Sequence, residues 1–286
     1  MTIAAQKVVP STHATYRHTV PVRITHWMNV VALFILLLSG FQIFNAHPSL
    51  YWGERSDNGR AVLSMGVQTT ASGERRGVTS IAGRAFDTTG VFGLSRNADG
   101  DLVALGFPSW ATIPSSRWLS MGRRWHLFFA WFFVVNGFLY VVYSLVSRHL
   151  SRDLLPHKTE WRGIGRSFID HLLFRHPRGG EKARYNILQK LAYVLVIFAI
   201  GPLAVLTGLS MSPWIDSLVP ITDLFSGRQS ARTVHFIAAF AFVGFVLIHV
   251  FMVLITGVWN NLRSMITGRY DIVDDETKNG DNSPRL

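Results

Sequence analysis

Four long apolar segments constrain this sequence more than any other feature. Each is long enough to cross the hydrocarbon core of a bilayer as a helix, which takes about 20 residues. They are roughly Thr25–Phe44, Trp125–Val146, Leu188–Met211 and Thr233–Val258. With 49% hydrophobic residues in a chain of 286, the sequence is apolar for a soluble protein of its size. We therefore predict an all-α membrane protein, built as a bundle of four transmembrane helices.

The first segment is predicted to be a retained helix and not a signal peptide. It follows a polar head, and no small-residue cleavage site comes directly after it. We divide the chain into a cytoplasmic N-terminal segment (1–24), a membrane domain (25–270) and a polar C-terminal tail (271–286). Within the membrane domain, the first two helices are joined by a long loop at about 45–122, and a second loop spans about 148–186.

The distribution of charge predicts the orientation. The head carries Lys7, Arg17 and Arg23 and no acid, and residues 148–186 carry nine Lys or Arg against four acids. Basic flanks of this kind face the cytoplasm, so we expect a multi-pass membrane protein with both termini cytoplasmic. The loop at 45–122 is then periplasmic or otherwise outward-facing. Most of the net charge of +11 lies on these flanks, and this argues against a nucleic-acid partner.

The two long loops allow different interpretations. The periplasmic loop is rich in Gly, Ser and Thr and shows turn and short-strand signals. It is either a docking surface for an extracytoplasmic partner or a segment that packs on the helix ends. In the cytoplasmic loop, EWRGIGRSFIDHLLFRHP has the pattern of a short helix on the inner membrane surface. Its four histidines are interpreted as solvated or at headgroup level, and they are His149, His157, His171 and His176.

The absence of cysteine limits the cofactors that the chain can hold. Disulfides, iron–sulfur clusters, covalently attached c-type haem and thiolate metal sites are excluded. Any metal must be held by histidine, carboxylate or methionine side chains.

Two histidines on the fourth apolar segment, His235 and His249, are its most informative residues. They enclose thirteen residues without a charge. Fourteen residues correspond to about 21 Å along a helix and return to within about 40° of the starting direction. Both imidazoles therefore leave the same face at opposite membrane depths, which favours two stacked cofactors over one binuclear site.

Two further histidines complete the pattern. His26 begins the first segment and is expected near the inner surface, and His126 begins the second and is expected near the outer surface. The depths match as His126 with His235 and as His26 with His249. Two opposed imidazoles form the axial ligation of a low-spin haem that transfers electrons. The alternatives are histidines that hydrogen-bond a neighbouring helix, or a zinc site, for which HExxH and a third ligand are lacking.

Other residues near these histidines are candidates for contacts with the cofactors. Arginines could pair with haem propionates, although helix-end arginines also simply extend towards the membrane surface; they are Arg23, Arg123, Arg124 and Arg232. Glycines could let a porphyrin approach the backbone, or could serve ordinary helix packing; they are Gly40, Gly137, Gly208 and Gly244.

The sequence resembles the bacterial di-haem cytochrome b superfamily over about residues 17–270, except for much of the periplasmic loop. The resemblance rests on RITHW, the fourteen-residue histidine spacing, NAHPSLYWG, ARYNILQKLAY and RSMITGRY. The superfamily includes the formate dehydrogenase gamma subunit, the cytochrome b subunits of nickel–iron hydrogenase and thiosulfate reductase, and bacterial cytochrome b561. It implies four helices, two b haems and axial ligands at His26, His126, His235 and His249.

The resemblance also implies a quinone site near the inner haem, at Asn186, Gln189 and Lys190. A side-chain cap at the start of the third helix is the alternative role of Asn186. The long periplasmic loop departs from the short formate dehydrogenase and hydrogenase types and is closer to versions that accompany molybdopterin oxidoreductases. A molybdopterin enzyme is thus the favoured periplasmic partner, with a hydrogenase as the alternative.

We therefore expect an electron-transfer subunit that links a periplasmic oxidoreductase to the quinone pool of a respiratory chain. Its cofactors are two b haems, and quinone is an exchangeable substrate in the lipid. One alternative is a membrane anchor that docks a periplasmic redox enzyme with little electron transfer of its own. A transporter is the other, and the lack of an inverted repeat and of carboxylates in the four segments argues against it.

Overall fold

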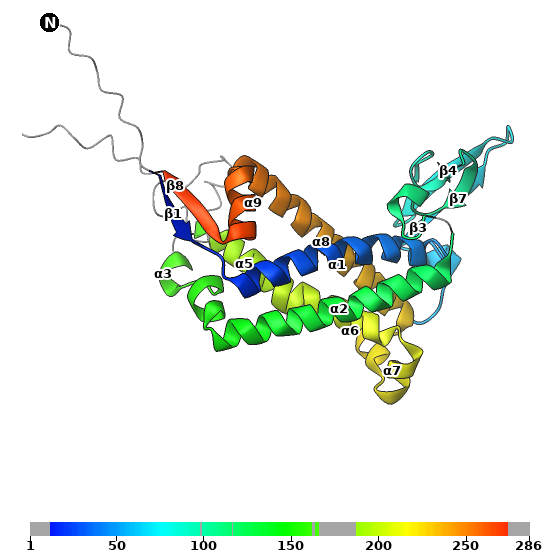
Figure 1. Ribbon diagram of the computed structural model, residues 1–286. Coiled ribbons are helices and arrows are strands. Elements are labelled where there is room, and N and C mark those ends of the chain that lie inside the picture. The colour runs from blue at the N-terminus through cyan, green and yellow to red at the C-terminus, as the bar shows by residue number, and fades with distance from the viewer. Residues whose placement is uncertain (1–11, 98, 116, 162–163, 166–186, 274–286) are drawn as a thin grey trace, which may run out of the picture. The chain divides into compact units, whose positions relative to one another are not determined.

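The computed structural model describes residues 12–97, 99–115, 117–161, 164–165 and 187–273, and Figure 1 labels their elements. In this part of the chain, four helices are long and apolar enough to cross a membrane. They are α1 (Val20–Phe44), α2 (Leu119–Val146), the continuous helical stretch Ile187–Ser210, and α8 (Arg228–Ile255). The predicted bundle of four spans is confirmed at this level, and α1, α2 and α8 each begin at least five residues before the predicted start.

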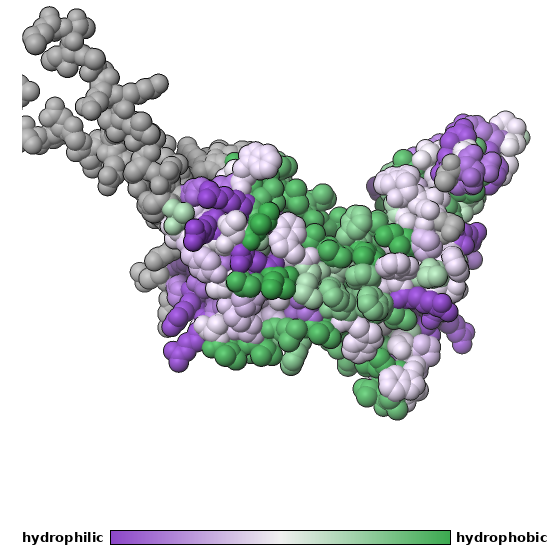
Figure 2. Space-filling view, in the orientation of Figure 1, coloured by the Kyte–Doolittle hydropathy of each residue, from purple (hydrophilic) through white to green (hydrophobic). Residues whose placement is uncertain are grey.

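The apolar faces of these helices are largely uncovered by protein. Between 6% and 22% of the most apolar window of each helix is buried, so most of that surface requires lipid around it. On α2 the exposed residues recur at helical spacing, at Leu127, Phe128, Trp131, Val135 and Phe138. In Figure 2 hydrophobic surface covers the helices, and hydrophilic surface gathers over the sheet of β3, β4 and β5.

The third span is interrupted within its length. It comprises α5 (Ile187–Leu195), a π-helical turn η5 (Val196–Ile200) and α6 (Gly201–Ser210). Pro202 lies in the first turn of α6, directly after the π-helical turn, and it has no N–H to donate to the preceding turn of this continuous stretch. The chain then forms a short α7 (Pro213–Leu218) and the 3-10 helix η6 (Ile221–Phe225) before α8 begins.

The chain forms two compact units. Unit 1 contains residues up to Ile24, Tyr140–Leu195 and the chain from Phe245 onward; unit 2 contains Thr25–Leu139 and Val196–Gly244.

Unit 2 holds a strand-rich insertion between α1 and α2, so the chain is mostly helical and not purely α. A four-stranded antiparallel sheet has the order β2–β3–β4–β5, and β6 pairs with β7 in a separate ribbon. The strands are β2 (Ser49–Leu50), β3 (Leu63–Thr69), β4 (Arg75–Ile81), β5 (Arg84–Asp87), β6 (Gly93–Arg96) and β7 (Leu102–Leu105). Two 3-10 helices, η1 (Asn58–Arg60) and η2 (Ser109–Ala111), complete the insertion.

This insertion packs on the helix ends within unit 2. Its core is an aromatic cluster in which Phe41 stacks on Phe107 with ring centroids 3.9 Å apart, and Phe44 and Phe236 lie against the same ring. Asn45 is bonded twice to the Phe107 backbone, donating to its carbonyl at 2.9 Å and accepting from its N–H at 2.7 Å. Packing on the helix ends, one of the two interpretations of the loop, is therefore observed.

Unit 1 joins the two ends of the described chain. Strand β1 (Thr12–Tyr16) pairs antiparallel with β8 (Arg269–Val273), in a register that sets Thr12 opposite Val273 and Tyr16 opposite Arg269. Helix α9 (Val258–Thr267) precedes β8, and the Arg23 guanidinium donates to the carbonyl of Ile266 at 2.5 Å. The pairing of β1 with β8 brings together the segments that precede the first span and follow the last.

The loop at 148–186 is described only in part. It begins with a π-helical turn, η3 (Leu150–Leu154), and a short helix, α3 (Lys158–Trp161). Most of the expected surface helix lies outside the described residues, as do His171, His176 and Asn186.

Candidate functional site

The clearest site in unit 2 is formed by two histidines from different spans. His126 extends from α2 and His235 from α8, and their ring centroids lie 6.1 Å apart with the planes at 67°. Both lie in an apolar surrounding of membrane-spanning helices. Two histidines this close together within membrane-spanning helices form a functional-site candidate, because a polar side chain is costly in a membrane.

Backbone carbonyls determine which nitrogen of each ring carries the proton. His126 Nδ1 lies 3.1 Å from the Leu36 carbonyl on α1, and His235 Nδ1 lies 3.0 Å from the Ala204 carbonyl on α6. A carbonyl oxygen can only accept, so both Nδ1 atoms must be the donors. In a neutral imidazole the other nitrogen then holds the lone pair. Each ring therefore presents Nε2 as a ligand.

This arrangement fits a metal centre held by two imidazoles. Metal-bound histidines characteristically donate the second ring N–H to a carbonyl or carboxylate, which sets the tautomer and the ring orientation. In such a centre, the distance between the ring centroids is the sum of two metal–nitrogen bonds of about 2 Å each and the two distances from nitrogen to ring centre. This sum is close to the centroid separation of 6.1 Å. Within the described residues no three His, Cys, Asp or Glu converge on one point, and the candidate ligands are these two imidazoles.

The other two candidate ligands lie in different units. His26 belongs to unit 2, where the edge of its ring meets Trp27 with centroids 5.3 Å apart. His249 belongs to unit 1, where it stacks on Phe245 with centroids 5.9 Å apart. Their pairing remains a prediction.

The four arginines proposed to pair with haem propionates have distinct surroundings. Arg123 and Arg124 are exposed on α2, within three residues of His126. Arg232 on α8 donates to the carbonyl of His47 and lies over the Phe44 ring. Arg23 is bonded to Ile266 in unit 1. Their roles toward a cofactor remain predictions.

One candidate quinone residue has an ion-pair partner that the sequence did not indicate. The Lys190 ammonium, 6% exposed, contacts both carboxylate oxygens of Glu160 from α3, at 2.8 and 3.0 Å. Burial acts to raise the pKa of Glu160, but the hydrogen bonds from Lys190 and from the His157 N–H outweigh it and the pKa is lowered. Gln189 lies beside Lys190 on α5, and Asn186 is outside the described residues.

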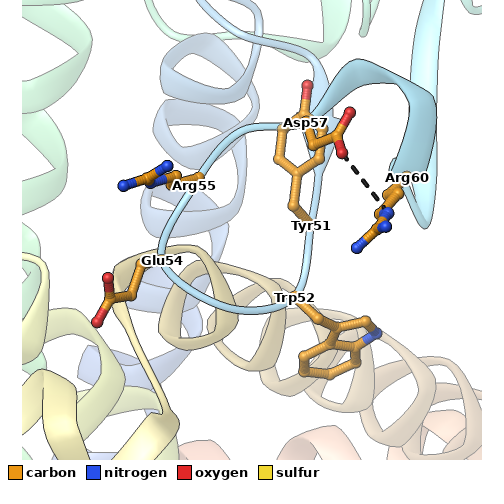
Figure 3. A pocket seen from close by; sticks show the side chains of 6 residues that line it. All are labelled: Tyr51, Trp52, Glu54, Arg55, Asp57 and Arg60. Carbon is orange, nitrogen blue, oxygen red and sulfur yellow. Dashed lines mark ion pairs between the residues drawn. The ribbon is translucent and has the colours of Figure 1, made fainter.

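A surface cavity of about 460 Å³ lies between β2 and η1 in unit 2. Its lining includes Trp52, Glu54 and Arg55, and Figure 3 shows Asp57 facing Arg60, an ion pair of 3.6 Å. The Asp57 and Arg60 side chains are 59% and 88% exposed. Charged side chains of both signs are exposed to solvent here, so we interpret the cavity as an ordinary surface depression between loops and not as a ligand site.

Sequence reasoning missed the groups that orient the histidines. Besides the two carbonyls, the Ser39 hydroxyl lies 3.1 Å from His126 Nδ1 and the Thr207 hydroxyl lies 3.1 Å from His235 Nδ1. Each hydroxyl residue is followed directly by a glycine, Gly40 or Gly208, that touches the same ring. The repeated pair of a hydroxyl residue and a glycine was the available signal.

Comparison with known proteins identifies the family of the chain. The family model for prokaryotic cytochrome b561 matches residues 100–268, which is more than half of the chain. A relative from Azospira oryzae is 27% identical over 247 residues, covering 86% of this chain and 93% of the relative. It is named as a candidate protein-methionine-sulfoxide reductase subunit, YedZ1. No solved structure matches. The chain therefore belongs to the prokaryotic cytochrome b561 family, multi-pass membrane proteins that bind haem b.

Proposed function

We propose that this chain is the di-haem cytochrome b subunit of a bacterial inner-membrane complex, and that it relays electrons between a periplasmic oxidoreductase and the quinone pool. The observation that carries the proposal is the opposed pair of His126 and His235. Both rings donate from Nδ1 to a carbonyl, which leaves the lone pair of each Nε2 free to bind iron, and the ring centroids lie 6.1 Å apart.

A second haem follows from the spacing of histidines on α8. His249 stands fourteen residues after His235 on this continuous helix, about 21 Å further along and within about 40° of the same direction. A ligand for a second haem is therefore present on the same face. We propose His26 as its opposing ligand, because the direction of α1 predicts the same depth.

The protein and the cofactor have separate tasks. Each haem, when bound, would supply one-electron redox chemistry. The chain would provide the imidazoles that hold the iron, and the apolar helices around them would lower the dielectric and exclude water. We propose that Arg123, Arg124 and Arg232 compensate the propionates of the outer haem, and Arg23 those of the inner haem.

The relative suggests the type of partner. We propose a periplasmic oxidoreductase of the molybdopterin type that acts on protein methionine sulfoxide, rather than a hydrogenase. Reduction of one sulfoxide consumes two electrons and two protons and yields a thioether and water. A quinol supplies two electrons and releases two protons, so with this partner the electrons flow from the quinol to the periplasm.

We place the quinone near the start of the third span, at Asn186, Gln189 and Lys190. The support is the Lys190–Glu160 pair, where a buried ammonium adjoins a carboxylate that is 31% exposed. Such a pair is suited to exchanging protons between the membrane and the cytoplasmic side. The hydroxyl groups of a quinol need such an exchange when they are oxidised.

The first test is the haem content of purified, detergent-solubilised protein, measured by the pyridine haemochrome method with reduced-minus-oxidised spectra. We expect about two b haems per chain, both low-spin. A folded preparation, expressed with sufficient haem, that contains no haem would rule out the proposal. One haem per chain would mean that the His26–His249 pair is wrongly assigned.

Electron transfer is tested separately from haem binding. When a quinol analogue is added to the solubilised subunit, we expect it to reduce the haems. The reduced haems should reoxidise when a periplasmic methionine sulfoxide reductase and its substrate are added. Full haem content without reduction by the quinol would instead favour the membrane-anchor function.

A further inference from the structure

Two spans of unit 2 carry the same short pattern. Residues 35–40 of α1 read ILLLSG, and residues 203–208 of α6 read LAVLTG. In each, the second residue offers its carbonyl to a histidine, the fifth has a hydroxyl and the sixth is glycine. The two segments are far apart in sequence, yet they contact the two histidines that face each other.

On α1 the geometry determines what the Ser39 hydroxyl can do. The Ser39 hydroxyl donates to the Ile35 carbonyl at 2.6 Å, a bond within its own helix. Its proton is used there, so its oxygen meets His126 Nδ1 at 3.1 Å as an acceptor. The Nδ1–H is thus shared between two oxygens, those of Leu36 and Ser39.

The same arrangement holds on α6. The Thr207 hydroxyl donates to the Leu203 carbonyl at 2.7 Å and lies 3.1 Å from His235 Nδ1, whose other acceptor is Ala204. Ser39 and Thr207 are both 0% exposed, so no water competes for these contacts.

The glycines bring the helix backbone up to each ring. A Cβ built at Gly40 would lie 3.5 Å from His126 Cε1, and one at Gly208 would lie 3.4 Å from His235 Cε1. These are contact distances, so the helix backbone forms a wall along each imidazole. By contrast, a Cβ at Gly137 or Gly244 would meet nothing within 4 Å.

A bond from a serine or threonine to its own helix is common in membrane helices and carries no function by itself. Ser210, for example, is buried on α6 and donates to the Thr207 carbonyl at 2.8 Å. Ser39 and Thr207 differ because each also presents its oxygen to a ring nitrogen. The same contact at both histidines of one pair argues for a role at the cofactor.

We propose that Ser39 and Thr207 are positioning residues for the haem held between His126 and His235, each acting as a second acceptor for the Nδ1–H of its histidine. This inference rests on the proposed function. The two acceptors restrict rotation of each ring. They also make the imidazole more basic, which favours the ferric haem and lowers its midpoint potential.

The test compares variants that remove the hydroxyl with variants that keep it. Ser39→Ala and Thr207→Val remove it with little change of shape, whereas Ser39→Thr and Thr207→Ser retain it. Ser210→Ala is the matched control on α6. The measurements are the midpoint potential of each haem by optical redox titration, the EPR spectrum of the ferric protein and the haem content.

Removing either hydroxyl is expected to raise the midpoint potential of one haem only. At a fixed solution potential the ferrous-to-ferric ratio should rise at least threefold, which is about 28 mV for a one-electron couple. The largest g value of the same haem should move, because it depends on the angle between the imidazole planes. The potential and g value of the second haem should stay at their wild-type values. Both haems should keep wild-type values in the variants that retain the hydroxyl, Ser39→Thr and Thr207→Ser, and in the control Ser210→Ala.

The outcomes separate this inference from the proposed function. Full haem content with unchanged potentials and g values in both Ser39→Ala and Thr207→Val would overturn the positioning role and leave the haem site intact. A shift of equal size in Ser210→Ala would overturn it as well. A wild-type protein that binds no haem would instead defeat the proposed function. If Ser39→Ala fails to fold, the comparison of Thr207→Val with Thr207→Ser decides.

Discussion

At the scale of single residues, the two histidine pairs should be separable. His126→Ala removes one axial ligand of the proposed outer haem, and His249→Ala removes one of the inner haem. Because the ligands on α8 are about 21 Å apart, we expect each variant to lose about half of the b haem and to keep the other half. Pyridine haemochrome assays and EPR spectra of the remaining haem measure this.

His149→Ala is the control for these variants. His149 lies in the loop after α2, where it is bonded to Asp153 at 2.7 Å, so its loss should leave the haem content unchanged. Loss of both haems from His126→Ala, in protein that inserts normally, would contradict independent sites.

The pair of Lys190 and Glu160 gives a prediction for pH. Glu160 has a lowered pKa, so its ion pair stabilises the fold above the ordinary pKa of a glutamate. That contribution is lost as the pH falls through the lowered value. Glu160→Gln should therefore cost about 1.5–3 kcal/mol near neutral pH, the range for hydrogen bonds to charged groups, and much less in acid.

The measurement is thermal unfolding of the solubilised protein between neutral and acidic pH, with Glu74→Gln as the control. Glu74 pairs with Arg76 on an exposed part of the sheet, with both side chains about half exposed (59% and 48%), where an ion pair contributes little. An equal penalty for Glu160→Gln at all pH values would contradict the assignment.

At these positions sequence reasoning could find the ligand types but not their surroundings. Histidines in apolar helices stand out because a polar side chain is costly in a membrane, and helix direction estimates their depth. The acceptors that fix the tautomers are the backbone carbonyls of Leu36 and Ala204, and every residue has a carbonyl. Only the packing of α1 against α2, and of α6 against α8, selects these two.

At the scale of elements, an amide connects α1 and α2 within the membrane. Asn136, 1% exposed, donates to the Thr25 carbonyl at 2.8 Å and to the Asn29 side-chain oxygen at 2.7 Å. Bonds between membrane helices contribute about 0.6–1.7 kcal/mol each. We expect Asn136→Leu to destabilise the protein by about 1–3 kcal/mol, because it removes both bonds.

Unfolding in detergent, followed by the haem absorbance, measures the loss. The neighbouring Gly137→Ala is the control, because a Cβ there meets nothing within 4 Å and alanine favours a helix. The idea fails if Asn136→Leu is as stable as Gly137→Ala.

The elements differed in how far they could be predicted. Long apolar segments predict spanning helices well because the bilayer sets their length. The strands of the insertion depend on long-range pairing and on turns such as Ala82–Gly83, where both residues have positive φ angles of 48° and 80°. The turn signals indicated short strands there, but neither the strand order nor the packing of Phe107 on Phe41 was predictable.

At the scale of the whole molecule, the ends of the described chain provide evidence on topology that is independent of charge. Strand β1 lies before the first span and β8 follows the last, and they pair residue by residue from Thr12 with Val273 to Tyr16 with Arg269. Two strands in one sheet cannot lie on opposite sides of a bilayer. An even number of spans meets this condition, and the basic flanks predict that the common side is the cytoplasm.

The sequence contains no cysteine, so single introduced cysteines can locate each side directly. Ser72 is exposed in the turn between β3 and β4, and Ser151 is exposed after α2. We expect Ser72→Cys to react with a membrane-impermeant maleimide when it is added to cells with a permeable outer membrane and an intact inner membrane. Ser151→Cys should react only after the inner membrane is opened, and the wild type should never react. The reverse pattern would invert the topology and move the site of His126 and His235 to the cytoplasmic side. In that case the site could not receive electrons from, or pass them to, a periplasmic enzyme.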